Sequence, residues 1–337
     1  MKPRARLIDV ARDAGVSPAT VSRAVSQPDL LAPATLALVQ ASARKLGYVP
    51  DGAAQALASG RTMTVAAVVP TLDSIIFAKV LQAMQVTLSA AGYQLLVASH
   101  EYSAGTEAEA VRLLLARGID GLMLVGAERP AATTALIAGA NVPVVLTWCP
   151  DGVNASVGVD NALAGRLAAE HLIRLGHRRI GMVCGHLPFN DRQRGRLEGV
   201  RAALADAGLD LPDWRISHQP MTISGGRNGC SALLECAERP TALIGGIDLF
   251  ALGCIAEAQA RGLSVPGDLS VVGIDDTEMA SQVSPSLTSV HIPTARIGEM
   301  AALALLGRIR RAEAPTDALL PIDLIVRRSS TVPPPLS

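Results

Sequence analysis

The apolar residues near the start of the chain recur at the spacing of short amphipathic helices. They form three runs, which are Val10, Ala11 and Ala14, then Val21 and Val25, then Val39, Ala43 and Leu46. Gly15 permits a left-handed turn after the first run, and Ser17 with Pro18 is suited to cap and start the second helix. The pattern predicts a helix-turn-helix closed by a third helix, with the second helix suited to the DNA major groove.

Residues 51–60 then predict one more short helix. This segment starts with an Asp cap, has weak amphipathicity and carries a glycine near each end. A helix this short is marginal in water by itself. We therefore expect its order to depend on DNA or on a partner chain.

From Met63 the pattern changes to apolar strands that alternate with helices, as in a parallel sheet covered by helices. The first set comprises strands near 64–70, 93–98, 120–125 and 143–147, with helices near 74–91, 106–117 and 130–139. After a bridging segment at 155–160, the second set comprises strands near 179–183, 215–218, 242–245 and 269–274, with helices near 161–175, 191–207, 222–235 and 248–261. Beyond Asp275 we expect a strand at 286–291, a helix at 294–311 and short closing strands that cross back to the first lobe.

Composition agrees with this α/β organisation. The 337 residues are 49% hydrophobic but only 2% aromatic, so the cores must be built mainly from Ala, Leu, Val and Ile. The predicted fold class is an N-terminal all-α helix-turn-helix domain followed by an α/β bilobed body with two parallel-sheet lobes. A chain of this length is expected to form two or three packed units.

Charge is divided unevenly along a chain whose formal net charge is zero. Residues 1–61 contain eight basic and four acidic side chains, which leaves 22 basic and 26 acidic side chains in the remainder. A basic head on an acidic body concentrates the attraction for phosphate groups in the head.

Several classes of protein find no support in the sequence. The five cysteines and six histidines show no metal-ligand spacing, so we expect buried reduced thiols, no metal and no cofactor. No spacing suggests a nucleophile with its base, and Gly225 to Gly229 lacks the setting of a dinucleotide loop, so we expect a non-enzyme. No signal peptide or apolar membrane span is recognisable, which predicts a cytoplasmic protein without a membrane partner.

The motifs together resemble the lac repressor and galactose repressor (LacI/GalR) family of bacterial transcription factors. The residues that carry the resemblance are Asp9-Val-Ala, Ala14-Gly-Val-Ser, Thr20-Val-Ser-Arg, Leu46-Gly-Tyr-Val-Pro, Ala54-Gln-Ala-Leu-Ala, Gly158-Val-Asp-Asn, Leu175-Gly-His-Arg-Arg-Ile, Arg196-Leu-Glu-Gly and Val272-Gly-Ile-Asp-Asp. They span almost the whole chain in the family's order.

The resemblance implies a body like the type I periplasmic binding proteins and gives roles to three domains. Residues 1–50 would be the DNA-binding domain, 51–61 the hinge helix and linker, and 62–337 the effector-binding and dimerisation domain. Its N-lobe would comprise about 62–160 and 292–322, and its C-lobe about 161–291 with the C-terminal strand.

The resemblance also assigns DNA contacts. Pro18, Ala19 and Arg23 occupy base-reading positions, and Arg23 alone among them has hydrogen-bond donors for a guanine, although a grip on phosphate is the alternative. The hydroxyl groups expected at phosphates belong to Ser17, Thr20 and Ser22. Leu57, with the small Ala54 beside it, matches the leucine that wedges into the minor groove, whereas sequence alone favours a packing leucine.

For the effector, the resemblance points to residues at the carboxyl ends of the strands, where parallel sheets bind ligands. The candidates are Asp73, Phe77, Trp148, Arg196, Asp248 and Asp275. Asp275 would accept sugar hydroxyls, Arg196 rather than Arg194 would contact the ligand, and Asp248 has helix capping as its alternative. Trp148 is similar to its counterpart in gluconate-type repressors, with packing in the lobe core as the alternative.

The expected protein is thus a homodimeric repressor that binds double-stranded operator DNA under the control of a small metabolite. A sugar or a gluconate-like sugar acid is the first candidate effector, and a nucleobase or other non-sugar effector is the alternative. A solute-binding protein would share the bilobed body, but it predicts an export signal and no helix-turn-helix.

Overall fold

The computed structural model describes residues 5–150, 152–311 and 317–334, except for the side chains of residues 53–55 and 58. The chain divides into two compact units, Met1–Thr64 and Val65–Ser337. The first unit contains α1 (Leu7–Asp13), α2 (Pro18–Ser26), the 3-10 turn η1 (Pro28–Leu30), α3 (Pro33–Leu46) and α4 (Gly52–Ser59).

The apolar runs of the first unit close one small core, as the sequence predicts. Val10, Val21 and Val39 are buried, one from each of the first three helices. Gly15 has φ +65° in the turn between α1 and α2, a conformation that glycine adopts at little cost. The Ser17 side chain accepts a hydrogen bond from the Thr20 amide at 3.1 Å, which caps α2.

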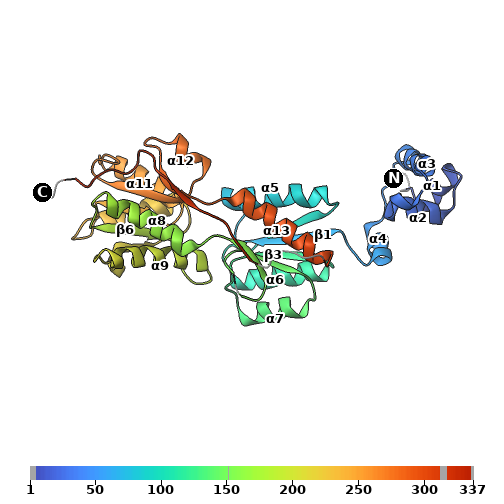
Figure 1. The fold of residues 1–337 in the computed structure, drawn as a ribbon, viewed down its shortest axis with the longest axis horizontal. Coiled ribbons are helices and arrows are strands. Elements are labelled where there is room, and N and C mark those ends of the chain that lie inside the picture. Colours follow the sequence, from blue (N-terminus) through green and yellow to red (C-terminus); the bar gives the residue numbers. More distant parts are fainter. Residues whose placement is uncertain (1–4, 151, 312–316, 335–337) are drawn as a thin grey trace. The chain divides into compact units, whose positions relative to one another are not determined.

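The second unit begins with an α/β lobe, here called the N-lobe. Its strands are β1 (Thr64–Val69), β2 (Gln94–Ser99), β3 (Gly121–Val125), β4 (Val144–Trp148), β5 (Ala155–Gly158) and β11 (Asp317–Leu319), in the sheet order β11-β5-β4-β3-β1-β2. Its helices are α5 (Ile75–Ala90), α6 (Ala104–Ala116), α7 (Ala131–Gly139) and α13 (Thr294–Ile309). Figure 1 shows α5 and α13 on one face of this sheet and α6 and α7 on the other.

The other lobe, the C-lobe, repeats the arrangement. Its strands are β6 (Ile180–Cys184), β7 (Ile216–His218), β8 (Ala242–Gly245), β9 (Ser270–Asp275), β10 (Thr288–His291) and β12 (Asp323–Ile325), in the order β12-β10-β9-β8-β6-β7. Only β12 is antiparallel to its neighbour among these pairs. The helical elements are α8 (Asn161–Arg174), α9 (Asp191–Asp206), η2 (Asp213–Arg215), α10 (Ile223–Leu234), α11 (Asp248–Ala260) and α12 (Glu278–Gln282).

The predicted two-lobed α/β body is confirmed, with two local differences. Residues 155–158 form strand β5 instead of a plain bridge, because they pair in parallel with β4 and are buried there. The two closing strands also separate, since β11 completes the N-lobe sheet and β12 joins the C-lobe sheet.

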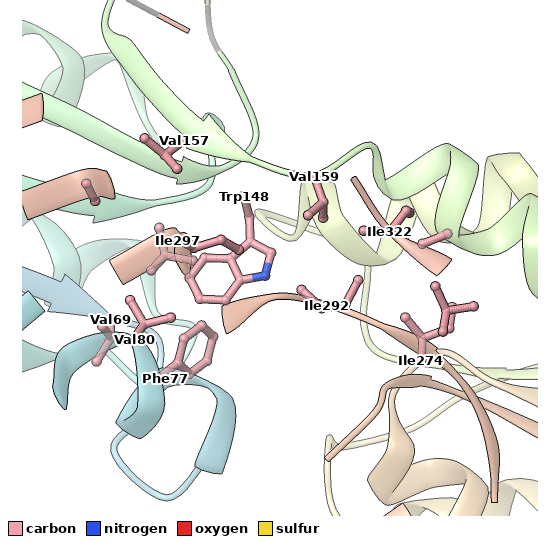
Figure 2. Packing of buried hydrophobic residues seen from close by; sticks show 14 of the residues in the cluster. Val69, Phe77, Val80, Trp148, Val157, Val159, Ile274, Ile292, Ile297 and Ile322 are labelled. Atoms are coloured by element: carbon pink, nitrogen blue, oxygen red, sulfur yellow. The ribbon is translucent and has the colours of Figure 1, made fainter. Parts of the chain in front are cut away.

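Three segments of the described chain join the lobes, between β5 and α8, between β10 and α13, and between β11 and β12. Val159, Ile292 and Ile322 lie in these segments and are buried. They belong to one apolar cluster that extends from Trp148 in the N-lobe to Ile274 in the C-lobe (Figure 2). Each connecting segment is therefore anchored in this shared core by one buried apolar side chain.

Two glycines let α8 and α9 pack closely. A Cβ at Gly165 would lie 1.9 Å from the Arg196 carbonyl oxygen, and a Cβ at Gly199 would lie 1.8 Å from the Ala162 carbonyl oxygen. Real Cβ atoms do not approach an oxygen so closely, so only glycine permits this spacing. The spacing fixes the place of the α9 side chains relative to α8.

Replacement of Gly165 by Ala should destabilise the body, because the new methyl group would force α8 and α9 apart. We expect a loss of about 1–3 kcal/mol or more in the free energy of unfolding, measured by urea denaturation. Gly105→Ala is the matched control, since it lies in α6 with no atom within 4 Å of its Cβ. That control should leave stability unchanged or raise it by up to about 1 kcal/mol. Equal effects of the two substitutions would contradict the close packing of α8 and α9.

Candidate functional site

The outer face of α2 is the first candidate surface. Its exposed residues are Pro18, Ala19, Ser22 and Arg23, while Val21 is buried on the inner face. Arg23 makes no ion pair or side-chain hydrogen bond with any described residue. A free guanidinium on an exposed helix offers donors that guanine or phosphate accepts. The residues predicted to read bases thus share one accessible face.

The hydroxyl groups at the start of α2 are arranged differently from one another. Ser17 and Thr20 hydrogen-bond to each other at 2.9 Å, and Ser17 also caps the helix. The Ser22 side chain is exposed on the next turn. Contacts of all three with phosphates stay predictions, and two of these hydroxyl groups already have a partner.

The remaining charges of the first unit are partly paired. Lys45 lies 2.6 Å from Asp13 and lowers the pKa of that carboxyl group, and Arg12 lies 3.8 Å from Asp9. Arg23 has no carboxylate partner among the described residues. Its positive charge is therefore available to an anionic ligand.

Helix α4 carries the predicted minor-groove residues. The Leu57 side chain is 90% exposed, which is unusual for a packing leucine. An exposed leucine is compatible with the predicted wedge, which stays a prediction. The side chain of Ala54 lies outside the described residues.

The second candidate site is a pocket of about 300 Å³ between the lobes. Its walls come from the start of α5, the end of β9 and the segment that joins β10 to α13. Asp275, Lys79 and Arg296 contribute polar groups. Lys79 has no partner among the described residues, whereas Arg296 pairs with Glu299 at 2.7 Å. The position at the carboxyl end of a parallel strand is typical of ligand sites in α/β sheets.

Arg196 reaches Asp275 from α9. Its Nη2 atom lies 3.2 Å from Asp275 Oδ1, its Nη1 donates to the Gly246 carbonyl at 2.7 Å, and its Nε donates to Asn161 Oδ1 at 3.3 Å. Both charged side chains are almost completely buried. The structure thus brings these two predicted residues together, with the arginine already fully engaged inside the protein.

Asp275 has a strained and electrostatically unusual position. Its φ of +128° lies in a region that side chains other than glycine rarely adopt. Burial raises the pKa of Asp275 to about 7, although the nearby Arg196 opposes the shift. No hydrogen-bond donor in good geometry reaches its Oδ1 atom from the described residues. This oxygen is buried beside the Arg196 guanidinium, so a ligand would reach it only in exchange for Arg196.

Asp248, by contrast, has a structural role here. Its Oδ2 accepts hydrogen bonds from the Thr277 amide at 2.6 Å and from the Thr277 hydroxyl at 2.9 Å, and its Oδ1 accepts one from Ser289 at 2.5 Å. Ile247, not Asp248, is the N-cap of α11. The predicted effector contact therefore finds no support, because both carboxylate oxygens are used to hold the segment that follows β9.

Phe77 and Trp148 lie in the core of the N-lobe, so their predicted contact with an effector stays a prediction that their burial does not support. Their rings meet edge to face with centroids 5.2 Å apart, and both side chains are buried (Figure 2). Because each ring is covered by apolar neighbours, neither is available for stacking on a ligand in this arrangement. The packing alternative for Trp148 is the one that the structure supports.

Asp73 is exposed on the loop between β1 and α5 and is absent from the lining of the pocket. Lys79 is the residue that sequence reasoning missed. It lies on the outer side of α5, where the inward residues Phe77, Val80 and Met84 have the helical spacing. A lysine on the outer side of an amphipathic helix looks like any solvated lysine, so the pattern held no signal for it.

The described residues form neither a metal site nor a disulfide bond. No three His, Cys, Asp or Glu side chains there are grouped to hold a metal ion, and the five cysteines are free thiols. None of the described helices has the length and the apolar surface needed to cross a membrane.

Each of the two units contains a segment that matches a known protein family. Residues 6–51 match the family "Bacterial regulatory proteins, lacI family", and residues 169–330 match "Periplasmic binding protein-like domain". The chain is 33% identical to the HTH-type transcriptional repressor PurR of Proteus mirabilis over 331 residues, which are 96% of each chain.

Two solved structures have the same fold over nearly the whole chain. One is the lac repressor dimer bound to operator and the anti-inducer ONPF, with a TM-score of 0.87 at 27% identity, covering 98% of this chain and 100% of that one. The other is the complex of the transcriptional regulator CelR with cellobiose, with a TM-score of 0.73 at 32% identity, covering 97% and 100%.

The raised pKa of Asp275 predicts a pH dependence of stability. Between the ordinary value of 3.8 and about 7, the folded state holds a proton that the unfolded state has lost. This group's contribution is thus complete below the unfolded pKa and is lost as the pH rises through 7. Asp275→Asn should therefore reduce the fall in unfolding free energy between pH 5 and 7, by at most about 1.4 kcal/mol per pH unit. Urea denaturation at several pH values measures the two slopes, and identical slopes would contradict the shift.

Proposed function

The chain belongs to the LacI family and is an effector-controlled, DNA-binding transcriptional repressor, and from this premise we propose that it acts as a homodimer that binds a sugar acid between its lobes. The observation that carries the choice of effector is the pocket that holds both Asp275 and Lys79. At about 300 Å³ this pocket lies at the lower end of the range for small-molecule sites.

Two groups of opposite charge support a polyhydroxylated acid such as gluconate. The Asp275 carboxylate is an acceptor for a sugar hydroxyl that replaces Arg196, and the unpartnered Lys79 ammonium offers a positive charge to a carboxylate. The relative CelR has been solved with cellobiose, which supports a carbohydrate-like ligand in this fold. Because Trp148 is buried, no aromatic ring is assigned a role in binding this ligand.

The operator complex is proposed to follow the two-fold symmetry of the dimer. The lac repressor was solved as a dimer on its operator, which supports the same assembly here. Two copies of α2 would then contact two half-sites, with Arg23 as the base-contacting residue and Leu57 as the wedge between them. The free guanidinium and the exposed leucine support these roles.

Effector control requires a coupling between the pocket and the DNA. A ligand that engages Asp275 competes directly with Arg196, which links α9, α8 and the loop after β8. All of these contacts lie within the C-lobe, and Asp275 is the point at which they meet the pocket between the lobes. A coupling free energy of about 1–3 kcal/mol would change operator affinity by about 5- to 150-fold.

The role of Arg23 is tested by Arg23→Ala. If Arg23 contacts a base, the variant should lose discrimination between operator and random duplex while it retains salt-sensitive binding to both. The measurement is a titration of both duplexes at several salt concentrations, with the operator located by footprinting near the gene. Arg117→Ala, which removes one exposed charge from the N-lobe, is the control. An equal loss on all sequences would make Arg23 a phosphate contact instead.

The effector class is tested by thermal unfolding with D-gluconate, D-glucose and adenine. A ligand that binds only the folded protein raises its stability, by about 2.7 kcal/mol at a hundred times its dissociation constant. Gluconate should give the largest rise in Tm, and Lys79→Gln should reduce that rise, because it removes the positive charge. Arg117→Gln is the control, because it also removes one exposed positive charge but lies away from the pocket. A larger effect of glucose or adenine than of gluconate would contradict the sugar-acid proposal.

A further inference from the structure

The lobes are in contact at the side of the cleft opposite the three connecting segments. Those segments leave from β5, β10 and β11, which lie at or next to one end of each sheet. The strands at the other end are β2 in the N-lobe and β7 in the C-lobe. Because the connected side is covalently tied and packed with apolar side chains, the lobes can separate widely only at the side of β2 and β7.

One bridge lies at that side. Tyr102 follows β2, Met221 follows β7, and the tyrosine hydroxyl lies 3.8 Å from the methionine sulfur. Glu101 and Tyr102 have φ values of +47° and +58°, a left-handed pair that side chains other than glycine adopt at a cost. Burial raises the pKa of Tyr102 to about 12. The backbone is thus held in an unfavourable form that keeps the phenol against the other lobe.

A second bridge joins the start of α9 to the loop after β3. Asp191, the first residue of α9, accepts a hydrogen bond from the Ala127 amide at 2.6 Å. Glu128 forms an ion pair with Arg194 on the next turn of the helix. These contacts join residues 64 and 66 positions apart in the sequence, one lobe to the other.

The loop that carries Ala127 and Glu128 is itself fixed to the N-lobe. Arg129 is buried, donates to the Gly126 carbonyl at 2.8 Å and pairs with the buried Glu107 of α6 at 3.3 Å. On the other side of the bridge, α9 is held to α8 by the glycine contacts described above. The bridge therefore links two rigid parts and not two loose loops.

We propose that two bridges form a latch that holds the lobes together across the cleft. One is Tyr102 with Met221, and the other is Asp191 and Arg194 with residues 127–128. The lobes open by breaking both bridges together, so the latch sets how readily the cleft admits or releases a ligand. Its role in effector exchange rests on the proposed function, whereas the latch itself is tested without DNA or effector.

The test breaks one bridge and observes the other. The chain contains three tyrosines, so the full-length protein with 3-fluorotyrosine gives three fluorine resonances, and Tyr102→Phe identifies that of Tyr102. Asp191→Ala and Arg194→Ala should each move the Tyr102 resonance toward that of an exposed tyrosine and increase its broadening by a soluble paramagnetic agent. A purely local role of Asp191 or Arg194 would leave this distant signal unchanged and would overturn the proposal.

Matched controls lie on the same helix. Arg201 pairs with Asp213, and Asp206 pairs with Arg166, both within the C-lobe. Arg201→Ala and Asp206→Ala remove the same kinds of side chain from α9 without touching the other lobe, so the Tyr102 resonance should not move. Movement of equal size in the controls would assign the effect to α9 itself and overturn the latch.

Charge exchange keeps the test decisive if an alanine variant folds poorly. Arg194→Glu alone should open the latch, and the double variant Glu128→Arg with Arg194→Glu should restore the Tyr102 resonance. In the reverse direction, Met221→Ala should speed hydrogen exchange of the Ala127 amide about tenfold, the factor that corresponds to about 1.4 kcal/mol. Absence of rescue, together with an unchanged Ala127 exchange rate, would show that the two bridges are independent.

Discussion

A buried arginine is the constraint on which the arrangement of the C-lobe beside the pocket depends. Removing a guanidinium from water is costly unless acceptors surround it, and Arg196 finds them on α8, on the loop after β8 and at the end of β9. Four elements must therefore converge on one side chain. The close packing of α8 and α9 through glycine makes this convergence possible, and it places Asp275 at the wall of the pocket.

Most of the fold could be predicted because it depends on repeating patterns. The apolar strands and amphipathic helices of the body, and the cap of α2 at Ser17, are local features that a sequence displays directly. The sequence predicts only a bridge where β5 lies, because four residues are too few to show a pattern and the pairing with β4 decides the structure. Family motifs added the pair of Arg196 and Asp275, which no local pattern connects.

The rest of the site depends on packing between distant segments. Trp148 at the end of a strand is equally compatible with stacking on a ligand and with a core position, and the decisive neighbour, Phe77, comes from another element. The sequence predicts a ligand contact or a helix cap for Asp248, yet its partners Thr277 and Ser289 follow from the course of the chain after β9. The lobe-to-lobe contacts of Asp191 had no sequence signal for the same reason.

The shared apolar cluster has a consequence for how this molecule could be divided or recombined. Since Val159, Ile292 and Ile322 are buried in one interior with residues of both lobes, part of each lobe's core continues into the other lobe (Figure 2). In a chimera that carries one lobe from a relative, the two parts of this shared core would come from different proteins and would not match in shape. Ligand preference in this body is thus expected to change by single substitutions of side chains that line the pocket. Both lobes are expected to be retained together.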